Sequence, residues 1–194
     1  MDLLGLLFFL TCARIQRPLE IIKKYRPVWL FILKFFGLYI VGVLIYRNYL
    51  NQFDGGTDGI TLMVTEQAAD LLSLKFDDIT TYSCETCTHS EIRILENPFI
   101  YMIEGCNSVS VMLLFVAFVF AFSAPVKHYF WFIPVGLASI YITNLARIFI
   151  LGIVRIYYFE YFNAFHDYVF PAIIYGMVVV LWIVWVKYFS NVNA

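Results

Sequence analysis

The sequence predicts an all-α integral membrane protein, a bundle of about four transmembrane helices with a small external insertion that contains a helix and a hairpin. The first observation is composition: 62% of the 194 residues are hydrophobic and only 14% are charged. Soluble domains contain roughly 45–50% apolar and about 25% charged residues. The other two observations are long uncharged stretches and a consistent placement of Lys and Arg between them. No basic run indicates a nucleic-acid partner.

The uncharged stretches have the length of membrane spans, because a helix needs about 20 apolar residues to cross the hydrocarbon core. Residues 105–126, 128–146 and 168–186 carry no formal charge from Asp, Glu, Lys or Arg. A further stretch, residues 28–46, is interrupted only by Lys34. We therefore expect four transmembrane helices.

Lys and Arg indicate the orientation, because they are enriched in the short cytoplasmic loops of membrane proteins. Five of them lie in residues 1–27, which are expected to form a cytoplasmic N-terminal segment: Arg14, Arg17, Lys23, Lys24 and Arg26. Residues 28–46 then form the first transmembrane helix, residues 47–97 lie outside, and residues 98–189 form a bundle of helices two to four. The expected location is the cell inner (cytoplasmic) membrane, crossed several times.

The external segment contains signals for a helix and a hairpin. Asp58 is a suitable N-cap, and apolar residues recur at helical spacing from Ile60 to Leu72. This amphipathic helix is expected to lie on the outer leaflet, to form a lid over the bundle, or simply to pack onto it. Residues 79–82 and 92–95 alternate as short strands do and predict a small hairpin.

The predicted hairpin turn carries Cys84 and Cys87, with His89 beyond them. These residues are only part of a zinc site, which normally needs four ligands. Outside the cytoplasm a local disulfide or two idle thiols are expected instead, so we expect no metal and no cofactor. After the hairpin, Asn97-Pro98 favours an extended residue followed by the start of a helix. That helix is expected to lead into the second span.

Three residues with the chemistry of acyl transfer stand at the ends of three different spans, all on the expected outer, periplasmic side. Cys106 lies in a polar collar, residues 104–108, and a helix N-terminus or a nearby cation favours the thiolate form of cysteine. Arg147 lies close to the hydrocarbon, where an arginine is costly and indicates function or pairing. His166 precedes the last span, and an imidazole beside a thiol acts as general base and acid. The alternatives are a packed apolar cysteine, as we expect for Cys12, an arginine that reaches the interface, and an interfacial histidine.

Neighbouring polar residues extend this group. Glu104 belongs to the collar, and Asn144 lies three positions before Arg147 on the same helix face, so both are expected to support the site. Arg155 lies about two turns after Arg147, and it is either a second cation of the site or an interfacial anchor. Asp167 follows the histidine directly and could orient its imidazole, but adjacent side chains often diverge, so we do not count it as a third member of a catalytic triad.

The arrangement resembles the exosortase and archaeosortase family, most closely the compact exosortase F type of Bacteroidetes. Three motifs on successive spans carry the resemblance: Glu104-Gly-Cys106-Asn-Ser, Asn144-Leu-Ala-Arg147-Ile and His166-Asp167. The resemblance covers about residues 28–189, nearly the whole chain. It implies Cys106 as nucleophile, Arg147 as stabiliser and His166 as proton carrier. Many relatives have more spans than the four counted here.

The resemblance also implies a substrate. That family is understood to act on exported proteins with a C-terminal sorting signal, which consists of a short motif, a hydrophobic helix and a basic tail. The expected function is therefore that of a membrane-embedded cysteine transpeptidase or protease, which cleaves such membrane-anchored partners at the outer face of the bilayer. The alternative is a non-catalytic membrane scaffold or accessory subunit of a protein export or surface-anchoring system. A transporter is less expected, because no acidic residue lies deep within a span.

Overall fold

The computed structural model describes residues 24–53, 55–83 and 87–190. Three of its helices are long and apolar enough to cross a membrane: Arg26–Phe53, Val126–Tyr157 and Phe159–Tyr188. The described chain is mainly helical, which agrees with the expectation of a membrane protein. Most of the N-terminal segment expected for residues 1–27 lies outside the described residues.

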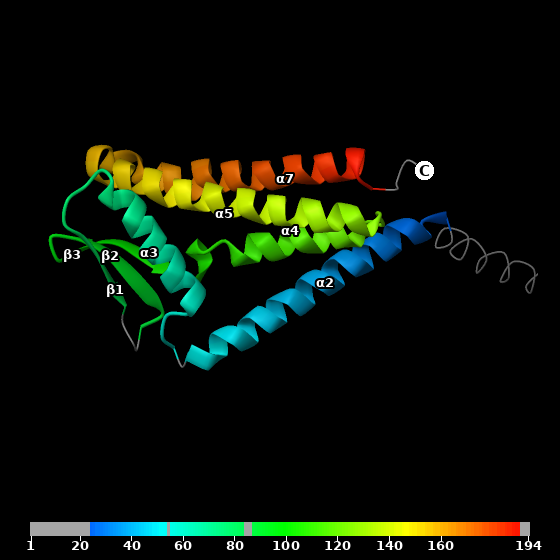
Figure 1. Cartoon of the computed structure of the whole chain (residues 1–194), viewed down its shortest axis with the longest axis horizontal. Helices are drawn as coiled ribbons and strands as arrows, with labels where there is room; N and C mark the ends of the chain where they lie inside the picture. The colour runs from blue at the N-terminus through cyan, green and yellow to red at the C-terminus, as the bar shows by residue number, and fades with distance from the viewer. Residues whose placement is uncertain (1–23, 54, 84–86, 191–194) are drawn as a thin grey trace, which may run out of the picture.

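Three helices run side by side along the long axis of the molecule (Figure 1): α4 (Val109–Ala121), α5 (Val126–Tyr157) and α7 (Phe170–Tyr188). Each helix contributes an aromatic ring to a shared core. The Phe132 ring of α5 lies 5.9 Å from Phe115 of α4 and 5.0 Å from Trp185 of α7, and all three residues are buried. These contacts hold the three helices together along one end of the bundle.

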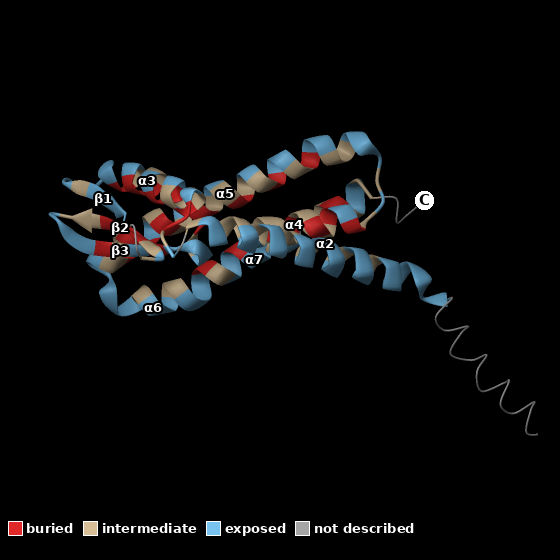
Figure 2. Cartoon of the chain, turned by 90° about the horizontal axis from the view of Figure 1, so that it is seen from below, coloured by how far each residue is buried: buried red, intermediate tan, exposed pale blue. Residues whose placement is uncertain are grey.

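Helix α2 (Arg26–Leu50) lies at the side of this bundle. It has Pro27 in its first turn, a position that proline favours. The helix packs chiefly against α4, and Figure 1 shows it diverging from the bundle toward its Leu50 end. None of its residues is buried (Figure 2), although nearly all are apolar. An exposed apolar surface of this length is suited to contact with lipid.

The second predicted span is shorter than expected. An uncharged stretch of 22 residues, 105–126, predicted it, but α4 contains only 13 residues. At 1.5 Å per residue it measures about 20 Å, less than the hydrocarbon thickness of about 30 Å. Ser108 precedes α4 with a positive φ of 60°, and Phe122 follows it with an extended backbone. The described residues thus contain three helices of spanning length and a fourth, shorter apolar helix.

The insertion between α2 and α4 forms one compact unit at the other end of the bundle (Figure 1). It comprises helix α3 (Gly59–Ser73) and strands β1 (Ile79–Ser83), β2 (His89–Ile94) and β3 (Asn97–Ile103). The side chain of Asp58 accepts hydrogen bonds from the backbone N–H groups of Ile60 and Thr61, so the predicted N-cap is confirmed. The strands pair antiparallel in the order β1-β2-β3, and α3 packs between this sheet and α5.

The predicted hairpin of β1 and β2 is confirmed, but the helix expected to start at Pro98 is wrong. Residues 97–103 form β3, so the fold is not purely α-helical and the bundle does not begin at residue 98. Leu95 and Glu96, both with positive φ, make the two-residue turn from β2 to β3. Such a turn usually contains Asn-Gly or Asp-Gly. The sequence therefore lacks the usual signal for this second hairpin.

A close approach of α4 to α5 depends on Gly136. A Cβ atom at this position would lie 2.2 Å from Cζ and 2.5 Å from Cε1 of Phe115, whose ring is fully buried. We expect Gly136→Ala to lower the free energy of unfolding by about 1–3 kcal/mol through overpacking. Thermal unfolding in detergent measures it. Gly176→Ala on α7 is the matched control, since nothing lies within 4 Å of its Cβ, and it should leave stability unchanged or raise it.

Candidate active site

A short polar turn carries Cys106 from the sheet into the bundle. Strand β3 ends at Ile103, a 3₁₀ turn spans Glu104–Cys106, and α4 begins at Val109. The side chain of Asn107, a residue that is only 1% exposed, holds this turn in place through hydrogen bonds. Its Nδ2 donates to the Tyr46 hydroxyl at 2.7 Å and to Thr61 Oγ1 at 3.0 Å, and its Oδ1 accepts from the Val109 N–H at 3.0 Å. The turn is therefore tied to α2, to α3 and to the start of α4.

Helix α5 holds the same turn from the other side. Asn144 is fully buried, and its Nδ2 donates to the backbone carbonyl of Cys106 at 2.7 Å. Asn144 is one of the residues predicted to support the site, and this bond connects it directly to Cys106. Because Arg147 lies one turn further along α5, one helix positions both the thiol and the cation.

The reactive residues meet in one cavity of about 200 Å³. Its lining includes Cys106, Arg147, Arg155 and His166. Cys106 is a free thiol and is partly exposed. The remaining lining residues come from β3, α5 and α6 (Phe162–Ala164): Ile100, Tyr101, Met102, Ile148, Leu151 and Phe162. None of the ten described lining residues is acidic.

The cavity contains two guanidinium groups in different surroundings. Arg147 is half-buried, and its Nε has no hydrogen-bond partner among the described residues. A buried donor without a partner is costly, so the Nε of Arg147 is available to donate to a further group. The guanidinium carbon of Arg155 lies 5.2 Å from the Phe162 ring centre and 6.0 Å from that of Phe99. Aromatic rings thus hold Arg155 at the cavity wall.

His166 comes from an unusual segment. Residues Phe165–Val169 form a π-helical turn just before α7. His166 Nδ1 lies 2.6 Å from Oδ1 of Asp167, and its ring stacks on Phe162 with centroids 6.0 Å apart. An ionised carboxylate only accepts hydrogen bonds, so Nδ1 carries the proton and Nε2 is left to take one when the ring is neutral. Asp167, which we did not count as a catalytic residue, is therefore in position to orient the imidazole.

Other predicted residues fall outside the cavity. Glu104, expected to support the site, is exposed and is not among the described lining residues. Conversely, the lining residues of β3 and the Phe162 ring were not predicted. The run Phe-Ile-Tyr-Met-Ile at 99–103 is rich in β-formers, and this signal identifies the strand once the preceding residues are recognised as a turn. For Phe162 the sequence contains no comparable signal.

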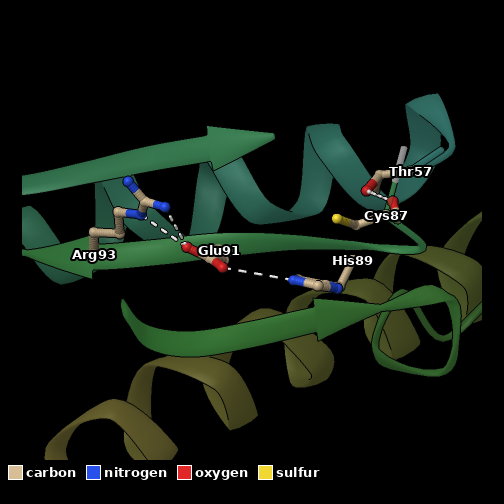
Figure 3. Close-up of polar contacts among 5 residues, drawn as sticks. All are labelled: Thr57, Cys87, His89, Glu91 and Arg93. Carbon is tan, nitrogen blue, oxygen red and sulfur yellow. Dashed lines mark hydrogen bonds and ion pairs between the residues drawn. The ribbon is translucent and has the colours of Figure 1, made fainter. Parts of the chain in front are cut away.

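The cysteine pair of the hairpin does not join the site. Cys87 is disulfide-bonded, which agrees with one of the two structures expected for it, and Cys84 lies outside the described residues. The backbone carbonyl of Cys87 accepts from Thr57 Oγ1 at 3.3 Å (Figure 3). His89 Nε2 lies 3.5 Å from Glu91, which also accepts from Arg93 at 2.8 Å. These contacts join the loop before α3 to the sheet and organise β2.

None of the protein-family models, curated proteins or solved structures compared with this chain matches it, so the cavity itself is the basis for a functional proposal.

Proposed function

We propose that the protein is a membrane-embedded cysteine transpeptidase or protease of the exosortase and archaeosortase type. It acts on membrane-anchored proteins at the outer face of the cytoplasmic membrane, cleaves their C-terminal sorting signal, and transfers or releases the product. The shared cavity is the observation that carries this proposal. It joins a free thiol, two guanidinium groups and an imidazole from separate elements, with no acidic residue among its described lining residues.

The proposed reaction assigns one role to each group. The Cys106 sulfur, after His166 has taken its proton, attacks the carbonyl carbon of the scissile peptide bond. Arg147 donates to the resulting oxyanion. His166 then gives the proton to the departing amine, the C–N bond breaks, and a thioester remains on Cys106. An acceptor amine or water attacks this thioester and regenerates the thiol, while Asp167 holds the imidazole by its Nδ1.

Helix lengths support a position of the cavity at a membrane surface. Along α5, Arg147 lies 21 residues after Val126, a rise of about 32 Å. His166 lies 21 residues before Lys187, near the far end of α7. Both intervals match a hydrocarbon thickness of about 30 Å. With Lys127 and Lys187 on the cytoplasmic side, the cavity opens at the outer surface.

The disulfide at Cys87 supports the same orientation. Disulfides persist in oxidising compartments outside the cytoplasm, and Cys87 lies between β1 and β2 of the sheet that also contains the cavity-lining strand β3. A scaffold needs no such cavity. In a scaffold Arg147 would be expected to pair with a carboxylate, whereas no ion pair of Arg147 occurs among the described residues.

Thiol labelling tests the proposal. We expect a membrane-impermeant maleimide added from outside to label Cys106 rapidly near neutral pH. His166→Gln should slow this labelling about tenfold, because the imidazole no longer draws the proton from the thiol. His128→Gln is the matched control: this histidine lies at the start of α5, at the other end of the bundle, and contacts the Phe189 carbonyl. Mass spectrometry of the labelled peptide gives the rates.

The labelling rates separate the proposed enzyme from the scaffold. A scaffold predicts slow labelling of Cys106 that is the same in both histidine variants. Cys106→Ala provides the background, since the peptide containing residue 106 then has no thiol to label. Equal rates for His166→Gln and the unmodified protein would contradict the role given to the imidazole.

A further inference from the structure

Strand β3 is an edge strand, and its open edge borders the cavity. The sheet order β1-β2-β3 leaves β3 paired on one side only. Ile100, Tyr101 and Met102 all line the cavity. Successive side chains of a strand point to opposite faces of the sheet. A cavity that is lined by three consecutive residues therefore most simply lies along the edge of the strand. In the view of Figure 2, α6 lies beside β3 on the side away from β2.

The chemistry of this edge is suited to pairing with a further strand. Every second residue of an edge strand directs its N–H and C=O groups away from the sheet, and proteins commonly protect such edges with charged residues. Residues 98–103 of β3 carry no charge: Pro, Phe, Ile, Tyr, Met and Ile. The opposite edge, β1, presents Thr80, Thr81 and Ser83 to solvent. Neither edge carries a charge, and the edge that borders the thiol is the more apolar of the two.

We propose that a segment of the substrate adds to the open edge of β3 as a fourth strand, and that this pairing delivers the scissile bond to Cys106. The proposal rests on the proposed function and names how its substrate is recognised. Addition of an extended peptide to a sheet edge is a general recognition mode, in which main-chain hydrogen bonds supply the affinity. The occupant is an extended polypeptide, because only a backbone presents N–H and C=O groups at the strand repeat.

The position of the thiol fits this pairing. Cys106 follows the last residue of β3 by three positions, and the Asn144 bond to its carbonyl fixes it at the end of the strand. A peptide that runs along β3 therefore passes from the edge directly to the sulfur. The two lining guanidinium groups favour an occupant that is neutral or acidic over a basic one.

Peptidyl thiol reagents test the pairing on the full-length protein in detergent. The probes are acetyl-trialanyl chloromethyl ketone, from which the Cys106 sulfur displaces chloride, and chloroacetone, which has the same reactive group without a peptide. We expect faster labelling by the peptidyl reagent. Methylation of a backbone nitrogen that pairs with β3 removes one hydrogen bond, so it should slow labelling about five- to tenfold. Because only alternate nitrogens of a strand face its neighbour, methylation of the nitrogens between them should slow labelling much less.

Hydrogen exchange provides the second measurement. After labelling with the peptidyl reagent, amide exchange in residues 100–103 should slow, whereas chloroacetone should leave it unchanged. The amides of β1, on the opposite edge of the same sheet, are the internal control and should not respond to either reagent. This readout requires no processing of a natural substrate, so it is independent of whether the proposed reaction is correct.

Several outcomes would overturn the proposal. They are equal labelling by the two reagents, equal effects of methylation at all three nitrogens, or no labelling of Cys106 at all. Protection of the β3 amides that rises with protein concentration before labelling would assign the edge to a second copy of the chain instead. In each case a loss of processing in Cys106→Ala would still support the proposed function, so the two failures are distinguishable.

Discussion

Replacing Cys106 with alanine is expected to abolish processing of a membrane-anchored substrate, with a loss of about 10⁴-fold or more, because the nucleophile carries the whole covalent route. Cys106→Ser should be similarly inactive, since a serine hydroxyl is a much weaker nucleophile at a site built around a thiolate. The measurement is the appearance of the shortened substrate over time in membranes that contain equal amounts of each variant.

A cysteine control makes this result specific. Cys12→Ala removes a cysteine from the N-terminal segment and should leave the processing rate unchanged. Both variants should insert into the membrane at the level of the unmodified protein, because the Asn144 bond is made to the Cys106 backbone carbonyl and survives the substitution. Normal processing by Cys106→Ala would contradict the proposed function directly.

Removing the Arg147 guanidinium is expected to give the second largest loss. Arg147→Ala should lower kcat by about 10²–10³-fold, the usual effect of removing one oxyanion donor. The effect should fall on kcat more than on KM, because the oxyanion exists only during the reaction. Arg147→Lys should recover only part of the rate, since an ammonium group lacks the planar fork of donors. Initial rates at several substrate concentrations separate the two constants.

The chain contains two useful comparisons for this variant. Arg93→Ala removes an arginine that pairs with Glu91 on β2, away from the cavity, and should change the rate by less than about twofold. Arg155→Ala removes the second cation of the cavity, whose guanidinium is held among aromatic rings. This variant tests whether a position in the cavity is by itself enough for an arginine to contribute to kcat. If Arg147→Ala affects KM alone, Arg147 binds substrate and does not stabilise the oxyanion.

Local signals predicted much of the fold correctly. Asp58 begins its helix because an aspartate followed by apolar residues at helical spacing satisfies the first N–H groups. The β1–β2 hairpin follows from alternation on both sides of a polar turn. Span ends and charge placement alone predicted that Cys106, Arg147 and His166 lie on one side of the membrane, and in the structure all three line one cavity. Each of these depends on a periodicity or a charge that the sequence displays.

The errors concern conformations without such a signal. Leu95 and Glu96 adopt positive φ angles that these residue types rarely take, and the sheet pairing imposes them. The interpretation of Pro98 as a helix start was therefore wrong, and for the same reason the cavity-lining residues of β3 were not predicted. The predicted length of the second span was wrong for a related reason. Hydropathy shows that a segment is apolar, but it does not show whether the segment is helical along its whole length.

Contact between Asp167 and His166 depends on a feature no spacing rule describes. In a regular α-helix, adjacent side chains point about 100° apart. Within the π-helical turn Phe165–Val169 the two side chains nevertheless meet. Single π-helical turns occur frequently at functional sites. Asp167→Asn is therefore an informative companion to any His166 variant.

The shortness of α4 has a consequence for hydration. Asn144, whose side chain holds the Cys106 carbonyl, lies 18 residues after Val126 along α5, a rise of about 27 Å. Irregular backbone is tolerated at such a depth only where protein buries it or a water-filled space receives it. The cavity of about 200 Å³ that Cys106 lines is large enough to hold water beside this turn. On the proposed function, that water is the first acceptor to reach the thioester, so transfer to an amine requires the acceptor to be bound before the amide bond breaks.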